Sequence, residues 1–298
     1  MKGMETIPNT SGFTRIDIGN LLKSHFPKIS PFVPRWTIRN LERLLHIGEI
    51  NDFLEAHFQD DPREFVRQCV LYFELTGTVR GQQYLEDAAS NRPVIVANHP
   101  LGGPESLVLM DVLASYAPEV RMVTKGIIGE IKPLQPLLVP IPKKHDRSSV
   151  ERFKTAFASD HPIIIFPAGY CSRVLSNGEI FDFAWHPTFV KMARKFDRPV
   201  LPVHISGANS KKFYRISAWR RALHIKTSFE SLYLPDEMYK QRGNSLVLTF
   251  GHPITPDALV HDIPDNSLAD RIRNHVFRLG KMPSACFDCD VEPLLPLT

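Results

Sequence analysis

From residue 92 onward, short apolar runs alternate with amphipathic stretches, and this alternation limits the folds that the chain can adopt. The runs have the length of strands, and most are rich in valine, isoleucine or leucine: Pro93–Ala97, Leu137–Ile141, Pro162–Phe166, Val200–Ile205, Thr227–Tyr233 and Leu246–Phe250. The stretches between them have apolar residues at helical spacing: Glu105–Tyr116, Ser148–Ser159, Trp185–Phe196 and Ser210–Leu223. This pattern predicts an α/β fold with a layered mixed sheet flanked by helices.

The first part of the chain has a different, helical pattern. Apolar residues recur at helical spacing within residues 38–45 and 65–73, and three prolines interrupt an apolar and basic segment before Trp36. We therefore expect a helical extension over residues 1–84, an α/β domain over 85–282 and a C-terminal tail over 283–298. The extension either packs on the main core or lies on lipid, with basic side chains facing phosphates: Lys23, Lys28, Arg35 and Arg39.

The composition excludes several classes of protein. With 43% hydrophobic and 23% charged residues among 298, the chain can form a sizeable core. Four cysteines are too few for a disulfide framework and fit a reduced, cytosolic setting. No apolar stretch has the length of a membrane-spanning helix, and the first residues do not resemble a secretory signal. The net charge of +4 suits an anionic surface but is too small to indicate nucleic acid.

The loop after the first apolar run carries several residues of special chemistry, in the order Asn98-His99-Pro100-Leu101-Gly102-Gly103-Pro104-Glu105. Its two glycines permit a sharp reversal of the chain, which can bring the Glu105 carboxylate onto one imidazole nitrogen of His99. The other nitrogen can then accept a proton from a substrate hydroxyl, because an imidazole with a pKa of about 6.5 is mostly neutral at pH 7. The alternative is a loop histidine that caps a helix, with Glu105 as an ordinary acid of the first turn.

A second loop follows the third apolar run, with the sequence Phe166-Pro167-Ala168-Gly169-Tyr170-Cys171-Ser172-Arg173. Arg173 can hold an anionic head group through two parallel hydrogen bonds, or it is a surface arginine beyond a turn. Backbone N–H groups near Gly169 can stabilise a developing oxyanion. Cys171 can in principle form an acyl-enzyme, but no residue beside it in the sequence is a suitable base.

Together these segments resemble the PlsC-like glycerolipid acyltransferases, which transfer a fatty acyl chain from a thioester to a lipid hydroxyl. Four motifs between about residues 75 and 255 carry the resemblance: Asn98-His99 with Glu105, Val139–Lys143, Phe166–Gly169 with Ser172 and Arg173, and Val200–Val203. The resemblance implies a PlsC-like fold, with His99 as the general base and Glu105 as its partner. It further implies that the remaining motif residues bind substrate, with Lys143 and Arg173 on the acceptor: Asn98, Gly102, Gly103, Lys143, Gly169, Ser172 and Arg173.

Two departures from the family pattern bear on the acceptor. The acid is Glu105 instead of aspartate and lies one residue farther from His99, and Ala168 replaces the glutamate of the third motif. In these respects the chain is similar to a bacterial subgroup labelled hemolysin-like, which includes O-acyltransferases of amino-acid-containing lipids. This resemblance implies a lysolipid acceptor of the lyso-aminolipid type and an acyl-carrier-protein (acyl-ACP) or acyl-CoA donor. It implies no cofactor and no metal.

A basic segment follows the fourth motif. Residues 211–226 carry six basic and no acidic side chains, and aromatic residues lie between them. Such an element lies on anionic lipid, docks an acidic carrier protein or is a solvated helix face, with nucleic acid as a further alternative. We expect contact with an anionic membrane surface and no nucleic-acid partner, for a cytoplasmic protein bound peripherally to the inner face of the membrane.

Two other functions stay open from the sequence. In a lipid or thioester hydrolase, water would replace the alcohol at the same base, and a non-catalytic protein would bind lipid or acyl carrier without turnover. Cys286 and Cys289 have the spacing of half a zinc site, but no second pair follows, so a loose tail is the favoured interpretation.

Overall fold

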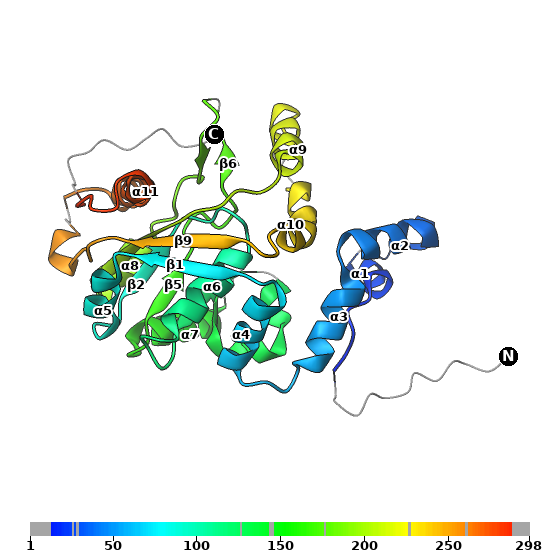
Figure 1. Ribbon diagram of the computed structural model, residues 1–298, viewed down its shortest axis with the longest axis horizontal. Coiled ribbons are helices and arrows are strands. Elements are labelled where there is room, and N and C mark those ends of the chain that lie inside the picture. Colours follow the sequence, from blue (N-terminus) through cyan, green and yellow to red (C-terminus); the bar gives the residue numbers. More distant parts are fainter. Residues whose placement is uncertain are drawn as a thin grey trace.

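A seven-stranded mixed sheet forms the centre of the protein (Figure 1). The computed structural model describes residues 13–25, 27, 30–125, 127–142, 146–175, 177–225, 228–259 and 262–287. The sheet has the order β1-β9-β8-β2-β5-β3-β4, and its pairs are parallel except for the antiparallel pair β8–β9. Its strands are β1 (Thr76–Arg80), β2 (Val94–Ala97), β3 (Arg121–Thr124), β4 (Leu138–Pro140), β5 (Ile163–Ile165), β8 (Val200–Ile205) and β9 (Ser245–Phe250). The expected α/β class with a mixed sheet is confirmed.

Helices cover both faces of the sheet, which explains why its central strands are continuous apolar runs. Along β2, Ile95 and Ala97 belong to one hydrophobic cluster, and Val94 and Val96 belong to the other. The first cluster contains side chains of α4 (Pro62–Tyr72), α5 (Gln82–Ala89) and α6 (Pro104–Leu113). The second contains side chains of α7 (Arg147–Ala158), α8 (Thr188–Lys195) and α11 (Asp265–Lys281).

The N-terminal helices lie beside one end of this core (Figure 1). They are α1 (Ile18–His25), η1 (Ser30–Phe32), α2 (Arg35–Leu44) and α3 (Ile47–Ala56). The expected end of the extension at residue 84 is wrong, because β1 pairs in parallel with β9 and α4 packs in the same core cluster as α6. The α/β unit therefore begins with α4. Residues 1–12 of the expected extension lie outside the described residues.

The remaining elements follow the second loop and lie at one end of the sheet. They are the two-stranded hairpin β6 (Arg173–Val174) and β7 (Ile180–Phe181), α9 (Lys211–Ala222), η4 (Phe229–Tyr233) and α10 (Leu234–Lys240). Three further 3-10 turns are η2 (Ile127–Glu130), η3 (Lys132–Leu137) and η5 (Pro256–Ala258). The strand expected over Thr227–Tyr233 is wrong, since its described part is a 3-10 turn that leads into α10 and turns Glu230 into the interior. Of the expected C-terminal tail, residues 283–287 are described.

None of the helices among these described residues combines the length and the apolar character that a membrane span requires.

Candidate active site

The two loops that the sequence singles out meet at one edge of the sheet. Strands β2 and β5 are adjacent and parallel, with Val96 opposite Ile165, so the chain leaves both strands at the same edge. The backbone N–H of Ser172 donates to the carbonyl of His99 at 2.7 Å. The imidazole of His99 also lies against the ring of Phe166, with ring centroids 4.6 Å apart. The two loops therefore lie side by side.

The side chains of His99 and Glu105 contact each other where the two loops meet. The imidazole Nδ1 lies 2.9 Å from Glu105 Oε1, and the Glu105 side chain is fully buried while 18% of the His99 side chain is exposed. The backbone N–H groups of Leu101 and Gly102 donate to Oε1 at 2.9 and 2.8 Å, and that of Gly103 donates to Oε2 at 2.8 Å. Gly102 has φ = +91°, a conformation that glycine adopts readily. The turn therefore wraps the carboxylate and presents the imidazole to the outside.

The two groups of this pair shift each other's pKa. Burial acts to raise the pKa of Glu105, but the His99 imidazole and the N–H groups of Gly102 and Gly103 outweigh it, so this pKa is lowered. Burial acts to lower the pKa of His99, but the Glu105 carboxylate outweighs it, so this pKa is raised. Because Glu105 stays ionised, it orients a proton on Nδ1 and leaves Nε2 as the nitrogen that can accept one.

Asn98 lies directly before the pair but is turned toward the sheet. Its side-chain amide donates to the carbonyl of Ile205 at 2.9 Å, and its side-chain oxygen accepts from the Ile205 N–H at 2.7 Å. The side chain is almost completely buried. Asn98 therefore joins the end of β2 to the end of β8 and fixes the starting point of the loop that carries His99.

Asp182, which follows β7, ties the two loops together and was missed in the sequence. It is fully buried and accepts hydrogen bonds from the Ser172 hydroxyl at 2.5 Å and from the Trp185 indole at 2.9 Å. The His99 backbone N–H lies 3.4 Å from the same carboxylate. Burial raises the pKa of Asp182. Ser172, expected to bind substrate, thus has its hydroxyl directed to Asp182.

Arg173 is buried instead of facing solvent. Its guanidinium donates to Ser217 Oγ at 2.7 Å, to the Cys171 carbonyl at 2.6 Å and to Glu230 Oε1 at 2.8 Å. The guanidinium carbon also lies 5.0 Å from the ring centre of Phe213. Sequence reasoning missed Glu230, because it assigned that residue to a strand. Arg173 is placed to hold the third-motif loop against α9 and η4.

Two further candidate residues of the second loop, Cys171 and Gly169, differ in burial. The Cys171 thiol is buried, and burial raises its pKa to about 12, so the thiol stays protonated at neutral pH. Gly169 has φ = +65°, and a Cβ built on it would meet nothing within 4 Å. Cys171 therefore lacks the character of an activated nucleophile, whereas Gly169 has open space beside its backbone.

Two expectations from the sequence concern residues outside the described part of the chain. Lys143, which was expected to contact the acceptor, lies outside it. Cys286 is exposed, and Cys289, its partner in the zinc-like spacing, is outside. Within the described part of the chain, no group of three or more histidine, cysteine, aspartate or glutamate side chains is placed to hold a metal ion.

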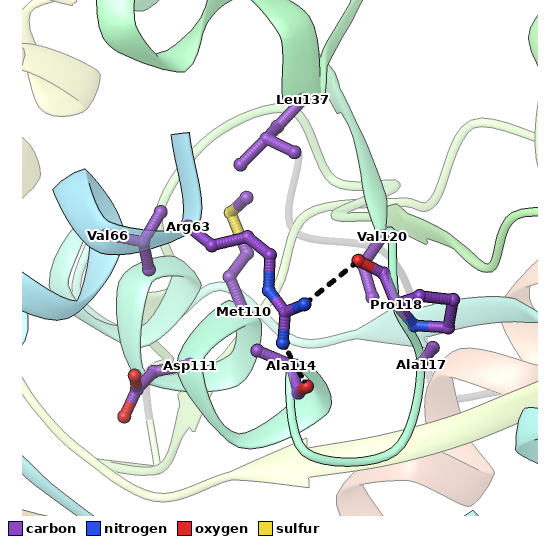
Figure 2. A pocket seen from close by; sticks show the side chains of 9 residues that line it. All are labelled: Arg63, Val66, Met110, Asp111, Ala114, Ala117, Pro118, Val120 and Leu137. Carbon is purple, nitrogen blue, oxygen red and sulfur yellow. Dashed lines mark hydrogen bonds between the residues drawn. The ribbon is translucent and has the colours of Figure 1, made fainter. Parts of the chain in front are cut away.

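A small pocket lies at the opposite end of α6 from Glu105 (Figure 2). Arg63 crosses it and donates to the carbonyls of Ala114 and Pro118, at 2.5 and 3.3 Å. The helical rise from Glu105 to Ala114 is about 13 Å. These contacts complete hydrogen bonds at the C-terminal end of α6, so the pocket belongs to the packing of α4 on α6 and not to the His99 edge.

Comparison with known proteins gives consistent matches over most of the chain. A model of the acyltransferase family matches residues 20–274. The chain is 35% identical over 242 residues to the lyso-glycine lipid O-acyltransferase of Phocaeicola vulgatus, which is 80% of this chain and 86% of the relative. It is 32% identical over 267 residues to the lyso-glycine lipid O-acyltransferase of Bacteroides thetaiotaomicron, which is 89% of this chain and 97% of the relative.

A more distant likeness is to the crystal structure of the 1-acyl-sn-glycerophosphate (LPA) acyltransferase PlsC from Thermotoga maritima, with 15% identity and a TM-score of 0.43. That match covers 88% of this chain and 96% of the solved chain. The resemblance expected from the motifs is confirmed by the family model and by the two relatives above 30% identity. The chain belongs to the acyltransferase family.

Proposed function

We propose that this acyltransferase moves a fatty acyl chain from an acyl thioester to the free hydroxyl of a lyso-aminolipid, with His99 as the general base. The observation that carries the proposal is the contact of 2.9 Å between His99 Nδ1 and a Glu105 carboxylate that three backbone N–H groups hold in place. A buried, ionised acid on one imidazole nitrogen is the arrangement that makes the other nitrogen an effective base. The partly exposed His99 ring is accessible to a substrate hydroxyl.

In the proposed step, His99 Nε2 takes the proton of the acceptor hydroxyl while its oxygen attacks the thioester carbonyl. A carbon–oxygen bond forms, the carbonyl oxygen becomes negatively charged, and the carbon–sulfur bond then breaks. The departing thiolate takes the proton back from the imidazolium, so that the base is restored. General-base catalysis of this kind contributes roughly 10²–10⁴-fold to the rate. The open turn at Gly169 is the proposed site of the developing oxyanion.

The acceptor class is supported by the sequence of the third motif and by the relatives. Ala168 stands where glycerolipid acyltransferases have a glutamate, and both relatives above 30% identity are named as lyso-glycine lipid O-acyltransferases. A lyso-glycine lipid offers a free hydroxyl on a fatty chain and a single carboxylate as its head group. We propose this acceptor class, with acyl-carrier protein or coenzyme A as the thioester carrier.

The test compares two acceptors with the same purified protein. We expect N-(3-hydroxyacyl)glycine to be acylated at least tenfold faster than lysophosphatidate, with either an acyl-carrier-protein or a coenzyme A donor. His99→Ala serves as the blank, because it removes the base. Turnover of lysophosphatidate without acylation of the glycine lipid would reject the proposed acceptor. Release of free fatty acid at the same rate without any acceptor would indicate a hydrolase.

A peripheral location on the inner face of the membrane is also part of this proposal. Both substrates would be amphiphiles that partition into lipid, and the described N-terminal helices expose Phe32 and Trp36 next to the basic residues of α2. Vesicle flotation of the purified protein tests it. Recovery of all the protein at the bottom of the gradient, with anionic vesicles at low salt, would contradict it.

A further inference from the structure

Four large apolar side chains are exposed on the C-terminal half of α9, directly after it and on η4. Trp219 is 73% exposed, Leu223 68%, Leu232 58% and Ile225 39%. We refer to these four residues as the α9 patch. Isolated exposed apolar residues are common on protein surfaces, but four that include a tryptophan and lie on α9, directly after it and on the neighbouring η4 indicate a contact surface.

The orientation of α9 gives the helix an inner and an outer face. Phe213, Ser217 and Arg220 recur at spacings of four and three and are buried. Trp219 and Arg215 lie on the opposite face, one turn apart, and both are exposed. The outer face therefore combines a large apolar ring with a cation, and it is not used by the packing of the helix.

Three basic side chains of α9 are exposed and have no acidic partner among the described residues, whereas two others are held by contacts within the protein. Among the six basic residues of 211–226, Arg220 is committed to Glu230 at 2.8 Å, and Arg221 donates to the Val174 carbonyl at 3.3 Å. Arg220 is therefore buried against Glu230 and does not belong to the exposed basic surface. Lys211, Lys212 and Arg215 are exposed, and none of them has an acidic partner among the described residues.

Lys212 connects the outer face of α9 to the neighbouring turn. Its ammonium group lies 5.1 Å from the ring centre of Tyr233, next to Leu232 in η4. This contact places Lys212 of α9 beside η4, the turn that carries Leu232.

The surface formed by α9 and η4 lies beside the edge of the sheet that carries His99. On its inner face, Ser217 of α9 accepts a hydrogen bond from Arg173, and the neighbouring Ser172 donates its N–H to the His99 carbonyl. Figure 1 shows α9 next to β6, outside the helices that cover the sheet. A layer in contact with the outer face of α9 would therefore be close to the loop that carries His99.

We propose that the α9 patch inserts into the interfacial region of an anionic bilayer and holds the His99 edge next to it. The proposal rests on the proposed function in one respect, namely that both substrates are amphiphiles. Tryptophan and leucine with adjacent lysine and arginine are the combination that enters the headgroup region. An acidic carrier protein would be bound by the cations but would give no reason for a tryptophan that is 73% exposed.

The direct test uses the fluorescence of Trp219. The chain has three tryptophans: Trp36, Trp185 and Trp219. Trp185 is buried, so the Trp36→Phe variant leaves Trp219 as the exposed reporter. We expect its emission to shift to shorter wavelength with vesicles of phosphatidylethanolamine and phosphatidylglycerol, and to be quenched by lipids brominated near the headgroup. An unshifted spectrum with vesicles that bind the protein would overturn the proposal.

Variants of the patch measure its contribution to binding. We expect Trp219→Ala with Leu223→Ser to weaken sedimentation with anionic vesicles about tenfold or more. Lys211→Glu with Arg215→Glu should weaken it by a similar factor at low salt, and less at high salt. Leu71→Ser, on the distant helix α4 and with a wild-type side chain 53% exposed, is the matched control and should change nothing.

Two measurements separate membrane insertion from protein docking and from a direct effect on catalysis. If the patch variants bind vesicles normally but lose an interaction with acyl-carrier protein, the surface is a protein-docking site and the proposal is wrong. With short-chain substrates that are soluble without lipid, the patch variants should retain wild-type turnover. Vesicle binding is measured without turnover, so an absence of lyso-aminolipid acylation would not affect this test. Likewise, an absence of vesicle binding by the α9 patch would not affect the test of the acceptor.

Discussion

The Arg173 guanidinium and the Glu230 carboxylate lie 2.8 Å apart in the interior, although the two residues are 57 positions apart in the chain. Glu230 Oε2 also lies 2.8 Å from Arg220 Nε. One buried carboxylate therefore connects the third-motif loop, the turn η4 and the inner face of α9. This arrangement links the loop next to His99 to the surface proposed to meet the membrane.

Removing this charge should destabilise the fold more than it changes the chemistry. Glu230→Gln leaves two arginines without their buried counterion, and breaking a buried pair in this way costs roughly 3–5 kcal/mol of the free energy of unfolding. Urea denaturation followed by circular dichroism measures the loss. The matched control is Glu179→Gln, whose partner Lys281 lies on the surface, and it should have little effect. Equal stability of the two variants would contradict the role given to Glu230.

Asn98→Ala should likewise act on stability instead of on substrate binding. The side chain makes two hydrogen bonds to the backbone of Ile205, and its removal leaves buried groups unpaired at a cost of about 2–4 kcal/mol. We expect a lower midpoint of unfolding and an unchanged KM for the acceptor in the folded fraction. A KM that rises tenfold while stability is kept would instead indicate direct contact with substrate.

The parts of the site that local sequence encodes were predictable, and those that depend on distant partners were not. The contact between His99 and Glu105 involves residues six positions apart on a glycine-containing turn, and β2 and β5 are continuous apolar runs. By contrast, β1 is a mostly exposed edge strand without an apolar run, and pairing with β9 defines it. The partners of Glu230 and Asp182 become visible only when the loops are folded together.

Two glycines of the site provide a matched pair for backbone strain. Gly102 has φ = +91°, and an added Cβ would lie 2.5 Å from the Cys171 sulfur. Gly169 has φ = +65° with open space around it. We expect Gly169→Ala to cost about 1–2 kcal/mol of stability and Gly102→Ala roughly 2–5 kcal/mol, because the latter adds overpacking to the backbone strain. Thermal unfolding of the two variants tests the order, which the reverse result would contradict.

A comparison of His99 with Cys171 tests whether the acyl group is transferred directly. His99→Ala should lower kcat by roughly 10²–10⁴-fold, because it removes the general base. Cys171→Ala should retain activity within about threefold, since a thiol with a pKa of about 12 is protonated at neutral pH. Rapid mixing with radiolabelled donor should give no covalent acyl-protein. Labelling of Cys171 together with loss of activity in Cys171→Ala would assign the nucleophile to the cysteine.

The dependence of kcat/KM on pH should report the effect of Glu105 on His99. A general base is active when unprotonated, so activity falls as the pH drops through the pKa of His99. Because Glu105 raises that pKa, the acid limb of the wild-type profile should lie above the ordinary value of about 6.5. In Glu105→Gln the carboxylate charge is gone while burial still acts to lower the pKa, so the limb should move to lower pH. The rate on the plateau should fall roughly 10³–10⁴-fold, as when a triad loses its orienting acid. An acid limb at the same pH in both proteins would show that the titrating group is not the imidazole held by Glu105.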